Sequence, residues 1–142
     1  MADITRPELA YDCLDLSTHN KDACIEDLRR MNKLIQRAKK TTGMIKYSKV
    51  CDDPKDIKIL AITDASHLKK EDRTKGVMGR VIYFSNADET QVCPVGWKSK
   101  VISTVCKSAK AAETRALDKC VEESIYVARC LKQILSGQRG QA

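Results

Sequence analysis

The sequence predicts an α/β fold in which a basic amphipathic helix precedes a three-stranded antiparallel meander and a long helix. Three observations predict this order: a helical spacing of apolar residues over residues 21–40, three β-rich runs between residues 57 and 97, and a second helical spacing over residues 108–135. The 142 residues are 42% hydrophobic and 32% charged, a globular composition that excludes collagen-like and disordered classes.

The N-terminal part of the chain is helical by pattern. The opening, up to Asn20, contains Pro7 and a short apolar set that fits one or two helical turns. Over residues 21–40, apolar residues recur at steps of four, three, four and three, which puts them on one helix face. These residues are Cys24, Leu28, Met31, Ile35 and Ala38. We predict that this amphipathic helix ends at residues 41–43 and that a short strand follows at residues 44–47.

The meander is predicted from three runs rich in β-branched and other apolar residues. Residues 57–63 predict a strand that is buried on both faces and runs directly into Asp64. Residues 77–84 predict the second strand and residues 91–97 the third, with a hairpin turn between them. Because Pro94 lacks a backbone donor, the third strand should lie at an edge of the sheet or carry a bulge.

The last predicted element is a long helix over residues 108–135. Its apolar residues share one face, and they include Leu117, Cys120, Val121, Leu131 and Leu135. The tail over residues 137–142 has a disordered composition.

The sequence predicts no membrane span, because no apolar run is long enough to cross a bilayer. Its seven cysteines include no Cys-x-x-Cys pair, which indicates reduced, mostly buried thiols. We therefore expect a cytoplasmic or nuclear protein without membrane contact.

The charge is unevenly distributed along the chain. The net charge of +7 comes from a basic segment at residues 21–50 and another at residues 97–142, with an acidic middle segment between them. Separated positive stretches suit a polyanion that lies across the fold, because neutralising phosphates releases counterions. The alternative is that these charges are ordinary solvated helix faces.

Two carboxylates stand out against their apolar surroundings. Asp64 ends a predicted interior strand, where an ionised acid needs a hydrogen bond, a charge partner or a metal; a turn cap made with Ser66 is the structural alternative. Helical spacing places Glu113 on the stripe of the long helix that faces the sheet, either as a capping or dipole device or in a functional role. Together the two acids would make an anionic pocket suited to Mg²⁺, which prefers one or two carboxylates plus waters and phosphates.

Several motifs in order carry a resemblance to a known family. The opening from Thr5 to Tyr11 reads TRPELAY, residues 63–66 read TDAS, residues 97–100 read WKSK, and Ala112 precedes Glu113. The chain resembles the part of copia-type LTR retrotransposon Pol polyproteins that runs from the end of the reverse transcriptase into the ribonuclease H domain. The resemblance covers nearly the whole chain.

The resemblance implies a fold and an activity. Residues 1–54 would be a helical connection segment from the end of the reverse transcriptase, and residues 55–136 the N-terminal part of a ribonuclease H-like domain. In that family Asp64 and Glu113 would be catalytic Mg²⁺ ligands for hydrolysis of the RNA strand of an RNA/DNA hybrid. A reverse transcriptase domain is then a possible partner. The candidates for phosphate contacts are Lys98, Lys100, Arg30, Lys33 and Arg37.

The sequence also departs from the family pattern. The family takes its next catalytic aspartate from a DNQSA-like motif beyond the long helix, and these 142 residues contain no such motif. We therefore expect a truncated or degenerate remnant with little nuclease activity. Two alternatives stay open: a non-catalytic basic module that binds nucleic acid or protein, and an unstable product whose incomplete sheet leaves an open edge.

Overall fold

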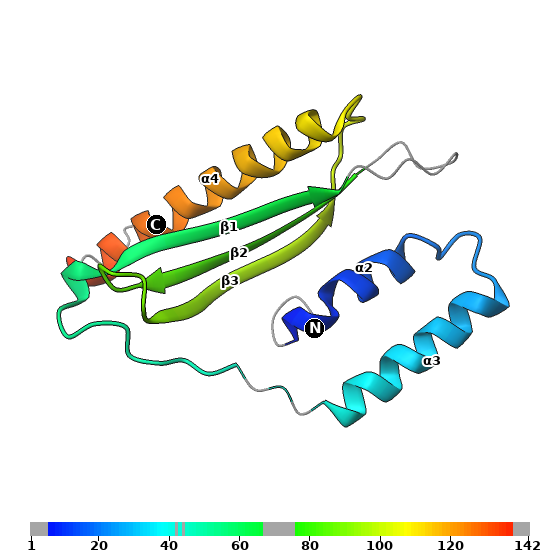
Figure 1. The fold of residues 1–142 in the computed structure, drawn as a ribbon, viewed down its shortest axis with the longest axis horizontal. Coiled ribbons are helices and arrows are strands. Elements are labelled where there is room, and N and C mark those ends of the chain that lie inside the picture. The colour runs from blue at the N-terminus through cyan, green and yellow to red at the C-terminus, as the bar shows by residue number, and fades with distance from the viewer. Residues whose placement is uncertain (1–5, 42, 44, 67–75, 138–142) are drawn as a thin grey trace.

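The computed structural model describes residues 6–41, 43, 45–66 and 76–137, which form an α/β fold (Figure 1). In chain order the elements are η1 (Pro7–Leu9), α2 (Ala10–Ser17), α3 (Ile25–Lys40), η2 (Pro54–Asp56), β1 (Lys58–Ser66), β2 (Val77–Ser85), β3 (Val92–Val101) and α4 (Ala109–Leu135). The predicted order of helices, strands and final helix is therefore confirmed.

The three described strands form an antiparallel sheet in the order β1-β2-β3. The pairing of β1 with β2 runs without a shift from Lys58 opposite Ser85 to Ser66 opposite Val77. The pairing of β2 with β3 shifts by one residue next to Pro94, so that Val95 is an extra residue on β3. Pro94 predicted an edge position or a bulge for this strand, and among the described strands β3 has both.

Helices cover the two faces of the sheet unequally. α4 packs against β1 and β2, while α2 packs near β3. Figure 1 shows α4 alongside β1 and the α2–α3 pair on the other side of the sheet. The main apolar cluster lies under the first half of α4 and consists of Met78, Ile102, Cys106, Ala112 and Ala116, with Ala65 and Ala111 packed against it. Small alanines let the helix approach the sheet closely, which fixes where α4 sits.

β1 is not buried on both faces, contrary to the prediction. The side chain of Ile62 is 56% exposed, and Ala61 is also exposed. Continuous apolar sequence is typical of an interior strand. In the described part of the chain, however, β1 has a neighbouring strand on one side only and an incomplete cover over one face, so its side chains keep contact with water.

The buried stripe of α4 is displaced from the predicted one. Ala112, Ala116 and Cys120 are buried, whereas Leu117 and Val121 are largely exposed. The apolar surface of α4 is wider than the surface that the sheet covers. The spacing of apolar residues therefore predicted a contact centred about one residue away from the one observed.

The apolar stripe of α3 is exposed rather than packed. Leu28, Met31 and Ile35 all face solvent, and α3 instead contacts α2 through polar groups.

The predicted strand at residues 44–47 falls partly outside the described residues, and residues 45–47 have no regular structure. The predicted disordered tail also lies outside them, apart from Gly137. Of the seven cysteines, Cys93, Cys106 and Cys120 are buried, so the expectation of mostly buried thiols was too broad.

Candidate functional site

Asp64 lies within β1, opposite Gly79 on β2, and its side chain is exposed. Because β1 continues in regular pairing through Ser66, Asp64 is not at a strand-to-loop junction, and the alternative of a turn cap made with Ser66 does not apply. Strand alternation puts the Asp64 side chain on the face of Ile62 and Ser66, and puts Ala65 on the face that α4 covers.

Glu113 lies just past the first turn of α4 and is exposed. The cap of this helix is made by Ser108, whose hydroxyl accepts a hydrogen bond from the Ala111 N–H at 3.1 Å. No acidic residue lies in the first turn, so Glu113 acts neither as the cap nor in the turn where the helix dipole is strongest. Its position leaves the carboxylate available for a charged ligand.

The two carboxylates lie at the same end of the fold. Ala65 and Ala112, their immediate neighbours in sequence, pack in one apolar cluster. Asp64 nevertheless leaves the strand on the face opposite Ala65 and lines a pocket to which Glu113 does not contribute, so the predicted anionic pocket of the two acids is not seen there. Within the described ranges, no group of three or more His, Cys, Asp or Glu side chains could hold a metal ion. Carboxylate oxygens suit Mg²⁺, but two of them predict weak binding that depends on water and phosphate ligands.

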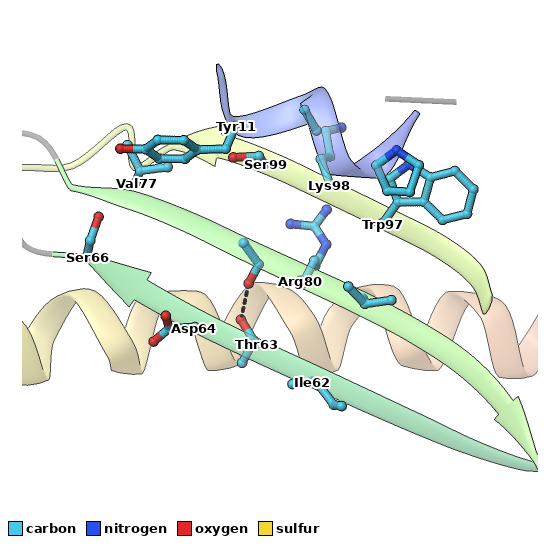
Figure 2. A pocket seen from close by; sticks show the side chains of 14 residues that line it. Tyr11, Ile62, Thr63, Asp64, Ser66, Val77, Arg80, Trp97, Lys98 and Ser99 are labelled. Atoms are coloured by element: carbon cyan, nitrogen blue, oxygen red, sulfur yellow. Dashed lines mark hydrogen bonds between the residues drawn. The ribbon is translucent and has the colours of Figure 1, made fainter. Parts of the chain in front are cut away.

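Asp64 borders a shallow pocket of about 520 Å³ on the face of the sheet away from α4. Figure 2 shows the side chains of Tyr11, from α2, and Trp97, from β3, on this near face, with α4 passing behind the sheet. The Thr63 hydroxyl donates to the Gly79 carbonyl at 2.9 Å and ties β1 to β2 beside the pocket. The Trp97 Nε1 donor is buried and has no hydrogen-bond partner among the residues that the structure describes.

The sequence analysis missed the part of this pocket that η1 and α2 provide. Pro7, Ala10 and Tyr11 line it together with the sheet. These residues belong to the TRPELAY motif, whose apolar Pro, Ala and Tyr spacing was a usable signal for a packing surface. Their distance in sequence from β3 hid the contact, because nothing in a local pattern indicates a partner about ninety residues away.

The candidate phosphate-binding residues separate into two groups. Lys98 and Lys100 are exposed on β3, and Lys33 is exposed on α3. Arg30 instead pairs with Asp15 at 2.5 Å, and Arg37 pairs with Asp12 at 3.0 Å. The hydrogen bond to Asp15 raises the pKa of Arg30 above its ordinary value. These two arginines hold α3 against α2, so the lysines are the better-placed phosphate contacts.

An ion pair of a buried arginine with a partly exposed glutamate was also missed. Arg80 on β2 is only 8% exposed and donates two hydrogen bonds to the Glu123 carboxylate on α4. The signal in the sequence was an arginine in the middle of an otherwise apolar strand, at residues 77–84. Cys120 lies beside this pair, and burial raises the pKa of its thiol. The pair sits in the contact between sheet and helix and joins the two layers.

Nothing among the described helices is both long and apolar enough to cross a membrane. No protein-family model, curated protein or solved structure matches this chain.

Proposed function

We propose that this chain is a degenerate ribonuclease H-type fragment of retrotransposon origin that binds RNA/DNA hybrid with little or no turnover. The observation that supports the proposal is the order of the elements: an antiparallel meander with Asp64 on its first strand, followed by a long covering helix that carries Glu113. The TRPELAY, TDAS and WKSK motifs border the pocket on the face of the sheet away from α4, whereas Glu113 lies on α4.

The chemistry of this region supports binding better than hydrolysis. Two-metal phosphodiester hydrolysis needs several carboxylates to hold two ions a few ångströms apart. With Asp64 and Glu113 alone, Mg²⁺ would be held weakly and chiefly through substrate phosphates. The exposed Lys98 and Lys100 would contact the sugar-phosphate backbone of the hybrid without reading its sequence.

A nuclease assay tests the catalytic part of the proposal. A labelled RNA/DNA hybrid is incubated with Mg²⁺ and the full chain, its Asp64→Asn variant, or Asp88→Asn as a matched control in the exposed turn between β2 and β3. We expect cleavage near background for all three proteins. Robust cleavage that Asp64→Asn abolishes and Asp88→Asn preserves would show a working enzyme and refute the degenerate state.

A second candidate is a basic module that binds nucleic acid with no role for the carboxylates. The observation that favours it is the absence of a three-ligand cluster from the described residues, beside exposed lysines on β3. The two candidates differ in Mg²⁺ dependence. If Asp64 and Glu113 hold a bridging ion, Asp64→Asn and Glu113→Gln weaken hybrid binding in Mg²⁺ but not in EDTA. Under the second candidate, neither variant changes binding in either buffer.

The lysines provide a separate measurement. Removing one lysine that binds a phosphate should reduce the slope of log affinity against log salt by about 1. We expect this for Lys98→Ala and Lys100→Ala, with Lys49→Ala as a surface control away from β3. An unchanged slope for both β3 variants would remove this strand from the interface.

A further inference from the structure

The outer side of β1 offers a long, regular strand edge. Within the described residues β1 pairs with β2 alone, and its nine residues contain neither a proline nor a bulge. Natural edge strands are usually shortened, bulged or heavily charged, because a row of free backbone donors and acceptors pairs with another strand. Along its length β1 carries none of these protections except two charged residues, Lys58 and Asp64.

The side chains along this edge form a self-complementary series. Lys58, Leu60, Ile62 and Asp64 alternate onto one face of β1, in the order basic, apolar, apolar, acidic. If a second β1 lies antiparallel with Ala61 opposite Ala61, Lys58 falls opposite Asp64 and Leu60 falls opposite Ile62. The same pairs then repeat on the other side of Ala61, so that at both ends of the pairing Lys58 of one copy faces Asp64 of the other.

Most side chains of this series are exposed, so a second strand could reach them. Lys58 and Asp64 are exposed, and Ile62 is 56% exposed. The Lys58 ammonium donates to the Ala87 carbonyl at 2.6 Å, and its remaining donors stay free for a carboxylate. Opposite charges and apolar pairs directly across an antiparallel ladder are the units that stabilise sheets.

α4 adds apolar surface beside the same edge. Leu117, Val121, Ala128 and Leu135 form a stripe on α4, and the last two line a pocket together with Ile59 of β1. Leu117 and Val121 are about half exposed. A strand added to β1 would bring its own helix alongside this stripe and cover it. The free backbone edge of β1 therefore has the helix stripe beside one face of the sheet and the charge series on the other face.

We propose that β1 pairs antiparallel with β1 of a second copy of this chain, centred on Ala61, to form a two-fold symmetric dimer with one continuous sheet. Such an interface is isologous, so both copies use the same patch and the assembly closes at two. Another exposed apolar surface, on α3, is the competing contact. Because α3 is a helix, it has no free backbone edge that could pair with a strand.

Sedimentation equilibrium of the full chain tests the dimer. Between about 1 and 100 µM, a range suited to moderate affinities, we expect the mass to rise from 15.9 kDa toward twice that value. Ile62→Lys should weaken association at least about tenfold, because it places ammonium groups opposite Leu60. Leu28→Lys, at an equally exposed position on α3, should have no effect. A monomer at every concentration, or a dimer that Leu28→Lys dissolves and Ile62→Lys spares, would overturn the proposal.

Charge exchange tests the register. Lys58→Asp and Asp64→Lys each place like charges opposite one another at both ends, so each variant alone should dimerise about tenfold more weakly. An equimolar mixture of the two variants should form heterodimers, because every facing pair is then opposite in sign. Circular dichroism of each variant checks that the fold is kept. If both variants fold but their mixture stays monomeric, the register centred on Ala61 is wrong. These experiments measure only dimerisation and not hybrid binding or cleavage, so their outcome is independent of the proposed function.

Discussion

The helical pair at residues 6–41 and the sheet with α4 are held together by different forces. α3 docks on α2 through ion pairs from Arg30 and Arg37, while Leu28 and its apolar neighbours face water. At the other end of the chain, α4 docks on the sheet through a dry cluster around Ala112 and Ala116. The first contact depends on exposed charges and the second on burial.

This difference predicts how stability is distributed. Ion pairs between partly exposed groups contribute little and weaken with salt, whereas buried apolar area contributes in proportion to its extent. Arg6 strengthens the first contact by donating to the Ala38 carbonyl at 3.2 Å and the Thr41 carbonyl at 2.9 Å. Even so, the helical pair should open before the sheet and α4 separate.

The largest effect is expected from placing a charge in the apolar contact. Ala116 is 1% exposed, so Ala116→Asp buries an unpaired carboxylate between α4 and the sheet. We expect a loss of about 4 kcal/mol in the free energy of unfolding, a large share of the roughly 5–15 kcal/mol of a typical domain. Urea denaturation followed by circular dichroism measures this. Arg115→Asp, one residue away and exposed, should change stability by less than about 0.5 kcal/mol.

The ion pair between sheet and α4 should come second. Glu123→Ala leaves the buried Arg80 guanidinium without its carboxylate, and we expect a loss of about 2 kcal/mol because Glu123 itself is partly exposed. The double variant Arg80→Met/Glu123→Met should lose less than Glu123→Ala alone, since no charge is then left unpaired. A double variant that is less stable than Glu123→Ala would mean that the pair contributes favourably beyond its desolvation cost.

A smaller effect is expected in the helical pair. Arg30→Ala removes the contact with Asp15 and should weaken the docking of α3 by about 0.5 kcal/mol, an effect that largely disappears at high salt. Hydrogen exchange of residues 25–40, compared at low and high salt, reports on this docking. Equal exchange at both salt concentrations would show that charge does not hold α3 in place.

The smallest effect is a pH dependence at the start of α3. Hydrogen bonds from the Cys24 N–H and thiol lower the pKa of the Asp27 carboxyl below its ordinary value. A lowered folded-state pKa gives stabilisation that is present above about pH 3.8 and is lost as the pH falls through the folded-state value. The protection of the first-turn amides of α3, measured as their exchange relative to the intrinsic rate at each pH, should therefore fall at acidic pH in the wild type. Asp27→Asn should remove this dependence, and a persistent one would assign it to another group.

The order of the elements could be predicted because each has a strong local pattern. Apolar steps of three and four identified α3 and α4, and Pro94 predicted an edge position or a bulge for β3. The ends of strands were less predictable: β1 and β3 each extend past the predicted end, through Ser66 and Val101. Polar residues there still pair in the sheet, because backbone hydrogen bonds do not depend on side-chain hydrophobicity.

The candidate site could be predicted only in part. Asp64 and Glu113 were found from their unusual apolar surroundings, yet both are exposed in the structure. The pocket contribution of Tyr11 and the pair between Arg80 and Glu123 were not found, because each joins segments far apart in sequence. Contacts of this kind depend on the path of the chain, which periodicity does not contain.

Local patterns in the chain were sufficient to identify three strands, a bulge and two amphipathic helices, because backbone preferences and side-chain periodicity act over a few residues. Which apolar surface is covered was settled by packing: the wide stripe of α4 is used only along Ala112, Ala116 and Cys120, and that of α3 is left in water. A helix presents the same face to any partner, and only the arrangement of the other elements in space determines whether a partner is there.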